Sequence, residues 1–302
     1  MFRTLIVIFL LQATFVLAQD AQTHYKKALQ YFNKENYEMA LSELKFVQVK
    51  EWKHADSWYL LGETRFILKQ YKEAMMAYNK AIELDLNHFK AWKNRGRLKA
   101  ALKDYRGSIN DFNKAIELNP EYSDAYFDRA LSNFYLKRLQ AADADFSRVL
   151  ELDPEDYEAS KTRGDVRYML GDYKGALESY DKAIELNPSD AKTYKERGKF
   201  KANMKDFEGA INDFTKAVSL DPNFSDAWFN RGLAYYFLEK YDASVKDFTK
   251  VIELNGDDTD AWYRRANSHF DWGKIENACQ DYSKAGELGM FEAYQVIADR
   301  CN

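Results

Sequence analysis

A spacing of 34 residues runs through most of this chain of 302 residues. Small and β-branched residues follow it without interruption, at Ala81, Ala115, Val149, Ala183, Ala217, Val251 and Ala285. The four prolines of the sequence follow the same spacing, at Pro120, Pro154, Pro188 and Pro222. A constant period of this length predicts a repeat architecture, in which each unit buries its apolar face against its neighbours.

Each unit contains two segments in which apolar residues recur at helical spacing. Trp92, Leu98 and Leu102 lie in the first segment of one unit, and Ile109 and Phe112 lie in the second. A proline follows several of the second segments and ends the helix there, because proline has no amide hydrogen and disfavours helix in the residue before it. The sequence therefore predicts an all-α fold built from helix pairs.

This pattern resembles the tetratricopeptide repeat (TPR), whose signature is W-x2-L-G-x2-Y, then A-x3-F, then a proline. The large residue at position 4 of the repeat is present as Trp58, Trp92, Tyr126, Tyr194, Trp228 and Trp262. In this register the repeats are 21–54, 55–88, 89–122, 123–156, 157–190, 191–224, 225–258 and 259–292. The resemblance implies a right-handed α-solenoid of eight helix-turn-helix repeats over residues 19–292, with a C-terminal capping helix at residues 293–302.

The first 18 residues have the layout of a secretory signal peptide. Arg3 precedes an apolar run, and Val16, Leu17 and Ala18 form a cleavage site before Gln19. The apolar stretch of about 14 residues is short for a helix that spans a bilayer, which needs about 20. An uncleaved anchor is the alternative. The sequence thus predicts an exported protein, periplasmic or secreted, with no stable membrane insertion once the signal is removed.

Composition and motifs argue against several classes of function. The chain has 44 basic and 48 acidic residues, and this balance lacks the basic footprint of a nucleic-acid-binding protein. Its four histidines have no second ligand at metal spacing, and the sequence has no phosphate-binding loop, nucleophile elbow or Cys–His pair. The unbroken period also leaves no long loop for a catalytic site. We therefore expect no enzyme, no cofactor and no metal.

Charged residues recur at two positions of the repeat. Arginine at position 7 faces aspartate at position 23 in the pairs Arg95 and Asp111, Arg197 and Asp213, and Arg231 and Asp247. A ligand-binding ladder of arginines is one interpretation, and internal pairing is the other. Repeat 55–88 lacks both charges, with Leu61 and Ala77 in their places, which favours internal pairing. We predict bidentate Arg–Asp pairs with a structural role.

The chain has two cysteines, Cys279 and Cys301. Cys279 falls on the second helix of the last repeat, and Cys301 on the capping segment, where Phe291, Tyr294 and Ile297 have helical spacing. This terminal segment resembles the last unit of many exported bacterial repeat proteins. A disulfide here would fasten the cap over the end of the stack and stabilise the fold by about 3 kcal/mol on the chain-entropy estimate. Two free, buried thiols are the alternative.

In the TPR family the first helices line an inner groove, chiefly at positions 2, 5, 9, 12 and 13. In this sequence those positions supply a cationic block followed by an aromatic block, and then the same order again: Lys90, Lys93 and Arg97; Phe127, Phe134 and Tyr135; Lys192, Lys195 and Lys199; Phe229, Tyr236 and Phe237. The stretch KDYRGSINDFNKA matches KDFEGAINDFTKA 102 residues later, which indicates that a block of three repeats was duplicated. Two similar partner-binding sites are therefore expected.

These blocks favour a groove that binds an extended peptide or protein tail with acidic and apolar groups, because exposed apolar patches beside charged ones mark interaction surfaces. In the structural alternative, the basic residues only keep an exposed face soluble and the aromatic residues lie partly in the core. Recognition of envelope polysaccharide by the aromatic residues is the functional alternative. The family's carboxylate clamp is not supported, because Arg97 replaces its asparagine and Asp128 stands at position 6 of the next repeat.

Overall fold

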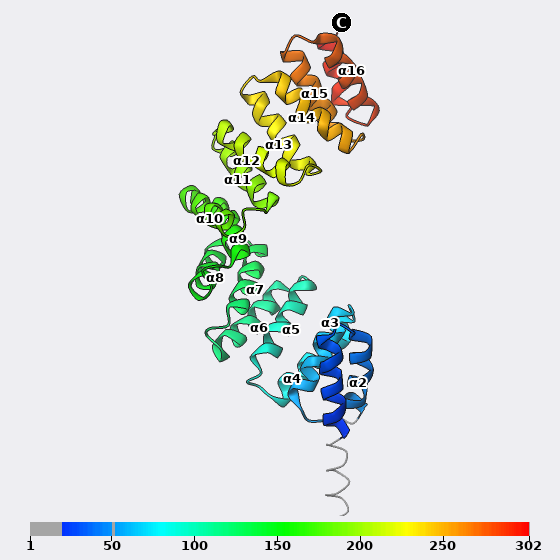
Figure 1. The fold of residues 1–302 in the computed structure, drawn as a ribbon, viewed down its shortest axis with the longest axis vertical. Coiled ribbons are helices and arrows are strands. Elements are labelled where there is room, and N and C mark those ends of the chain that lie inside the picture. Colours follow the sequence, from blue (N-terminus) through cyan, green and yellow to red (C-terminus); the bar gives the residue numbers. More distant parts are fainter. Residues whose placement is uncertain (1–19, 50–51, 302) are drawn as a thin grey trace, which may run out of the picture. The chain divides into compact units, whose positions relative to one another are not determined.

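The computed structural model describes residues 20–49 and 52–301, so the predicted signal segment at residues 1–18 lies outside the described residues. Every regular element in the described ranges is a helix (Figure 1). A helix over residues 20–33 is followed by α2 (Tyr37–Val49), α3 (Ala55–Ile67), α4 (Tyr71–Leu84), α5 (Phe89–Ala101), α6 (Tyr105–Leu118), α7 (Ser123–Tyr135), α8 (Leu139–Leu152), α9 (Tyr157–Leu170), α10 (Tyr173–Leu186), α11 (Ala191–Asn203), α12 (Phe207–Leu220), α13 (Ser225–Phe237), α14 (Tyr241–Leu254), α15 (Thr259–Asp271), α16 (Ile275–Glu287) and α17 (Glu292–Arg300).

The chain forms two compact units, one ending at Pro154 and the other beginning at Glu155. We call them unit 1 and unit 2. Within each unit, successive helices pack as pairs, such as α5 with α6 in unit 1 and α11 with α12 in unit 2, and each pair packs on the next (Figure 1). The predicted all-α solenoid of helix pairs is confirmed. No helix in the described part of the chain is long and apolar enough to cross a membrane.

Aspartate residues begin several of the second helices. Asp104 Oδ1 accepts a hydrogen bond from the amide of Gly107 at 2.9 Å, and Asp206 Oδ1 accepts one from the amide of Gly209 at 2.9 Å. A side-chain acceptor at this position pairs one of the free amides in the first turn of a helix. The duplicated stretch seen in the sequence therefore carries its own start signal for α6 and α12.

The two helices of a pair cross where a glycine faces a buried ring. A Cβ added to Gly96 would lie 2.7 Å from Phe112 Cε1, and one added to Gly198 would lie 2.7 Å from Phe214 Cε1. Both rings are fully buried. Close approach of the backbone thus requires glycine here, and the ring from the second helix fills the space that a side chain would take.

Arginine and aspartate join the two helices within a pair. Arg95 donates from Nε and Nη2 to the two carboxylate oxygens of Asp111 at 2.8 and 2.7 Å, and Lys99 Nζ lies 2.8 Å from the same carboxylate. The same bidentate arrangement occurs in Arg129–Asp145, Arg197–Asp213, Arg231–Asp247 and Arg265–Asp281. Arg95 Nη1 also donates to Asn79 of the preceding helix pair at 2.8 Å. The arginines therefore link neighbouring pairs as well as the helices within one pair.

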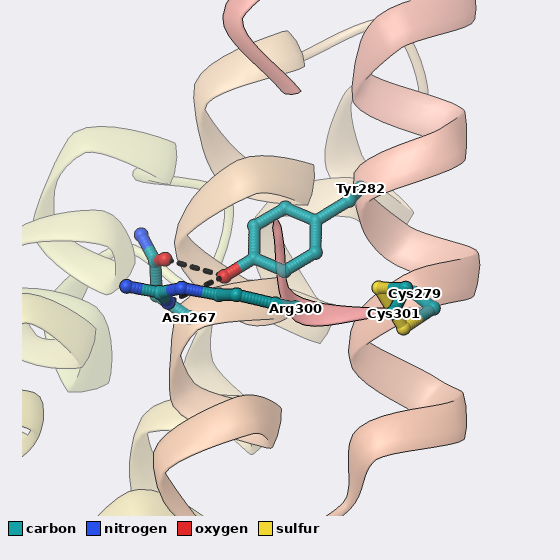
Figure 2. Close-up of a disulfide and its surroundings, with 5 residues drawn as sticks. All are labelled: Asn267, Cys279, Tyr282, Arg300 and Cys301. Atoms are coloured by element: carbon teal, nitrogen blue, oxygen red, sulfur yellow. Dashed lines mark hydrogen bonds between the residues drawn. A yellow bond between two sulfur atoms is a disulfide. The ribbon is translucent and has the colours of Figure 1, made fainter. Parts of the chain in front are cut away.

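The last helix, α17, packs against α16 and ends next to a disulfide between Cys279 and Cys301 (Figure 2). The guanidinium of Arg300 lies 4.5 Å from the ring centroid of Phe270, and its Nη1 donates to the hydroxyl of Tyr282 at 3.2 Å. That hydroxyl donates to Asn267 Oδ1 at 2.7 Å (Figure 2). The cap is thus held to the last helix pair by a covalent bond and a polar network.

Candidate partner-binding pockets

Each unit has a cavity lined mainly by its first helices. The cavity in unit 1, about 360 Å³, is named the Arg97 pocket; it is lined by Phe66, Arg97, Ala100, Ala101, Tyr105, Phe112, Asp128, Leu131, Ser132 and Tyr135. The cavity in unit 2, about 160 Å³, is named the Lys199 pocket; it is lined by Lys199, Ala202, Asn203, Phe207, Asn230, Leu233, Ala234 and Phe237. All eight residues of the second set have a counterpart 102 positions earlier in the first set. The two pockets are therefore equivalent places in a duplicated block.

Each pocket has a wall made of two stacked aromatic rings. Tyr135, at the end of α7, stacks on Tyr105, at the start of α6, with ring centroids 4.9 Å apart and planes 15° apart. Phe237 stacks on Phe207 in the same way, at 5.1 Å and 16°. Each outer ring is 59% exposed. A large apolar surface is thus held rigidly and left open to solvent, which is typical of interaction sites.

A cation lies at the rim of each pocket. The side chain of Arg97 is 44% exposed, and its guanidinium lies 5.7 Å from the ring centroid of Phe66. The side chain of Lys199 is 46% exposed, and its Nζ lies 3.1 Å from Glu196 Oε2. Arg97 presents a planar guanidinium with several donors, whereas Lys199 presents a single compact ammonium.

The polar residue opposite the cation differs between the pockets. In the Arg97 pocket it is Asp128, whose side chain is only 19% exposed; Oδ2 lies 3.5 Å from Lys93 Nζ and 3.9 Å from Arg97 Nε. Burial raises the pKa of Asp128 above its ordinary value, although both cations oppose the shift. In the Lys199 pocket it is Asn230, whose Nδ2 donates to the backbone carbonyl of Asp226 at 2.6 Å.

Two of the lysines predicted to bind a partner have acidic neighbours in the same unit. Lys93 is buried, and its Nζ lies 3.1 Å from Asp124 Oδ2 as well as close to Asp128. Lys195 Nζ lies 2.5 Å from Glu196 Oε1. Their charges are largely balanced by these partners, so Lys93 and Lys195 contribute less free positive charge to the groove than the sequence suggested.

The other predicted residues lie outside the two pockets. Lys90 and Lys192 are exposed, but neither lines a pocket. Phe127 and Phe229 are half-buried and meet the core rings Phe146 and Phe248 edge to face, at 5.5 and 5.4 Å. Phe134 lies 5.8 Å from Tyr135, ring to ring, and the hydroxyl of Tyr236 donates to Asp271 Oδ2 at 2.5 Å. Phe134 and Tyr236 thus lie against the outer rings Tyr135 and Phe237, whereas Phe127 and Phe229 contact the core.

Several residues that line the pockets were not among the predicted partner-binding residues. Tyr105 and Phe207 stand at position 17, where the repeat pattern places a residue that packs around the crossing of the two helices. Phe66 belongs to repeat 55–88, which precedes the repeat with the first cationic block. Asp128 and Asn230 stand at position 6 of the following repeat. The sequence did carry a signal for Tyr105 and Phe207, because these two aromatic residues stand at position 17 of repeats that are 102 residues apart in the duplicated block.

The described residues include no group of three or more His, Cys, Asp or Glu side chains that could hold a metal ion. The pockets instead offer aromatic rings beside one cation, with further polar side chains at Asp128 and Ser132 in one pocket and at Asn203 and Asn230 in the other. Such a surface can bind a ligand with apolar and polar parts.

Comparisons with known proteins agree with this architecture. One model of the tetratricopeptide repeat matches residues 55–88, 89–122 and 225–258, and a second matches residues 123–156 and 259–288. A third, described as TPR repeat, matches 164–205 and 202–238. Together these matches run over most of the chain. A comparison with curated proteins finds no matching sequence.

Three solved structures illustrate the similarity of fold. A tetratricopeptide repeat protein from Parabacteroides merdae has a TM-score of 0.60 and 19% identity over 83% of this chain and 99% of that one. PilF from Pseudomonas aeruginosa has a TM-score of 0.60 and 19% identity over 70% and 96%. YrrB, described as a TPR protein with an unusual peptide-binding site, has a TM-score of 0.53 and 24% identity over 61% and 95%.

Proposed function

This chain belongs to the tetratricopeptide repeat family, and from that premise we propose that it is a non-enzymatic scaffold for protein–protein interaction. Its first helices bind an extended peptide or protein tail that carries apolar and acidic groups. The Arg97 pocket and the Lys199 pocket are the two main contact points. Fold alone does not fix function, so the proposal depends on the chemistry of these pockets.

The exposed ring wall beside a cation is the observation that carries the proposal. Tyr135 and Phe237 each present more than half of their surface to solvent although each stacks on a second ring. Arg97 and Lys199 stand beside them with open side chains. An apolar side chain can cover the ring and a neighbouring carboxylate can pair with the cation, which is how a few anchors dominate the binding of a peptide.

Two further findings support parts of the proposal. YrrB, a structure of the same fold, is described as having a peptide-binding site. The disulfide between Cys279 and Cys301 supports export, because disulfides form and persist in oxidising compartments such as the periplasm or the extracellular space. We therefore propose that the scaffold acts outside the cytoplasm, which agrees with the signal-like sequence of its first 18 residues.

Crosslinking in cells tests the proposal. Partners of the wild-type chain are fixed with formaldehyde, recovered with the protein and identified by mass spectrometry. We expect the partners to be lost from a variant with Tyr135→Ala and Phe237→Ala, and to be kept by Met76→Ala. Met76 is the matched control because it is an exposed apolar residue of α4 outside both pockets.

Three outcomes bear on the proposal. Partner peptides that depend on the two rings support it. Partners that bind the double variant as well as the wild type contradict the assignment of the pockets. Retention of envelope polysaccharide in place of protein, lost in the double variant, would instead identify the ring walls as sugar-binding surfaces.

A further inference from the structure

Positive charge gathers in unit 1 where the first helix of each pair turns into the second. The turns after α3, α5 and α7 lie in residues 67–73, 102–106 and 136–140, and we call these three segments the turn face. Their basic side chains are all exposed: Lys69, Lys72, Lys103, Arg106, Lys137 and Arg138. The carboxylates of the same segments are Glu73 and Asp104. The turn face therefore carries an excess of positive charge.

The three segments lie next to one another at one end of the helix pairs. The Arg97 pocket is lined by residues in or directly beside all three, namely Phe66, Tyr105 and Tyr135. Apolar side chains are open to solvent on the same segments, since Leu102 is 53% exposed and Ile67 is 40% exposed. The turn face is thus one surface that combines cations with exposed apolar side chains.

The cations of the turn face are not paired with carboxylates. Elsewhere in unit 1, lysines pair with a glutamate three residues later, as in Lys80–Glu83 and Lys114–Glu117, both at 2.6 Å. Among the described residues, no ion pair joins a basic residue of the turn face to a carboxylate. Asp104 instead accepts a hydrogen bond from the amide of a residue in α6. The positive charge is therefore available to an anionic partner.

The geometry of the turns does not explain the lysines. Lys69, Lys103 and Lys137 have left-handed backbones, with φ of 59°, 64° and 60°, a conformation that is unfavourable for residues with a Cβ. At the equivalent positions of unit 2, Gly171 has a φ of 78° and Glu239 has a φ of 58°. Because glycine and glutamate make the same turn, its formation does not require lysine.

The equivalent segments of unit 2 have the opposite balance of charge. They are residues 169–175, 204–208 and 238–242, each 102 positions later in the duplicated block. Their basic residues are Lys174, Lys205 and Lys240. Their acidic residues are more numerous: Asp172, Asp206, Glu208, Glu239 and Asp242. The excess of positive charge thus belongs to unit 1 and is not a requirement of the repeat.

We propose that the turn face docks on the surface of an anionic phospholipid bilayer. Its lysines and arginines pair with headgroup phosphates, and Ile67 and Leu102 enter the interface between the headgroups and the acyl chains. A bilayer fits this face better than one acidic segment of a protein does, because the cations recur on three successive turns with exposed apolar side chains beside them. The protein lies on the bilayer and does not span it. The proposal goes beyond the scaffold function and does not depend on it.

Vesicle sedimentation tests the proposal. The purified full-length protein is mixed with vesicles of phosphatidylcholine alone or of equal parts phosphatidylcholine and phosphatidylglycerol, and the bound protein is measured in the pellet. We expect binding to the anionic vesicles to be stronger by about tenfold or more, and to weaken as added salt screens the charges. The apolar run at the start of the sequence would bind both kinds of vesicle, so the ratio of the two affinities isolates the contribution of charge.

Matched variants locate the effect on the turn face. Lys69→Glu, Lys103→Glu and Lys137→Glu together should weaken binding to the anionic vesicles by about tenfold or more. Glutamate is suited to these positions, because Glu239 makes the same turn in unit 2. The control makes the same change of charge in the equivalent segments of unit 2, with Lys174→Glu, Lys205→Glu and Lys240→Glu. It should weaken binding by less than about threefold, because salt screens the general repulsion from the lipid.

A further variant tests the apolar part of the contact. Leu102→Gln keeps the charge of the turn face and should weaken binding to the anionic vesicles by about threefold, because an exposed leucine no longer enters the interface.

The outcomes separate a bilayer from other partners. A loss confined to the unit 1 variant supports the proposal. Equal binding of the wild type to both kinds of vesicle, or an equal loss in the two triple variants, would overturn it. Capture of acidic proteins through the three lysines, without a preference for anionic vesicles, would also overturn it and assign the turn face to a protein. The comparison of the two vesicles on the wild type stands even if a variant does not fold, and none of these results bears on the peptide-binding pockets.

Discussion

The Arg97 pocket and the Lys199 pocket share one frame and differ in their polar groups. Both have stacked rings at positions 13 and 17 and a small residue, Ala100 or Ala202, against them. The cation is arginine in one and lysine in the other, and a carboxylate in the first is replaced by an amide in the second. The apolar frame is thus the same in both copies of the duplicated block, while the polar groups beside it differ.

This difference shows which parts of the repeat can vary. The buried rings of Phe112 and Phe214 and the glycines that face them fix how closely the two helices of a pair approach, so a change there disturbs the packing of that pair. Asp128 and Asn230 line the two pockets at the same position of the repeat, so the polar character of the pocket differs while the stacked-ring wall is kept.

The largest predicted effect tests whether the Arg–Asp pairs stabilise the helix pairs of the two units alike. Asp111→Ala in unit 1 and Asp213→Ala in unit 2 should each lower the free energy of unfolding by about 3 to 5 kcal/mol, because each removes the buried carboxylate that an arginine and a lysine share. The loss should be the smaller one for Asp213→Ala, since Arg197 keeps Asp181 as a second partner. Chemical denaturation of each variant measures the effect. A free energy of unfolding equal to that of the wild type in only one of the variants would show that the Arg–Asp pairs do not stabilise the two units alike.

The next effect is confined to unit 2. Cys279→Ser should lower the free energy of unfolding by about 3 kcal/mol on the chain-entropy estimate, since the bridge closes a loop with a sequence separation of 22 residues. Hydrogen exchange should increase in α16 and α17 and stay unchanged around the Arg97 pocket. Equal exchange throughout the variant and the wild type would contradict a stabilising role for the disulfide.

Overpacking at the helix crossings should have a smaller effect. Gly96→Leu and Gly198→Leu should each cost about 1 to 3 kcal/mol, because a Cβ at either position meets a buried ring at 2.7 Å. Gly232→Leu should cost less, since the nearest ring atoms lie 3.2 Å from the added Cβ. Thermal unfolding of the three variants gives the order. Equal losses at all three would mean that the ring distance does not control the cost.

The smallest effect is a dependence on pH that separates the two pockets. Because burial raises the pKa of Asp128, its protonation favours the folded state; this contribution is complete below the ordinary value of 3.8 and is lost as the pH rises through the raised pKa. Wild type should therefore gain stability relative to Asp128→Asn as the pH falls from 7 toward 4. Urea unfolding at several pH values measures the gain.

The equivalent position in unit 2 provides the control for this prediction. Asn230→Asp introduces a carboxylate there and should create a pH dependence of the same sign if the surroundings bury it as they bury Asp128. A wild-type protein whose stability differs from that of Asp128→Asn by a constant amount at every pH would rule out a raised pKa for Asp128.

Much of the fold could be predicted from the sequence because its determinants are local and repeat. The spacing of apolar residues predicted the helix pairs, and aspartate before Gly107 and Gly209 starts the second helices in both copies. The arginines at position 7 and the aspartates at position 23 of the repeat could be recognised as partners, because repeat 55–88 lacks both charges at once. A pairing within one repeat involves residues at a constant separation, so the period makes it visible.

The pockets were only partly predictable. Arg97, Tyr135, Lys199 and Phe237 were expected in the groove and line the cavities, but Lys93 was expected there as well and is buried. Lys93 and Arg97 are four residues apart on one face of α5, so helical periodicity treats them alike. What separates them is the approach of α7, which brings its carboxylates to Lys93 and leaves much of Arg97 open.

The sequence by itself determined the repeat, the helices and the pairs within each repeat, because these depend on spacing along the chain. Only the tertiary structure decided which side chains remain free to meet a ligand. Exposure depends on how far a neighbouring helix reaches over each position, and charge depends on the partners that this helix brings. Both are set by packing between repeats, which buries Lys93 beside Asp124 and leaves the side chain of Arg97 44% exposed.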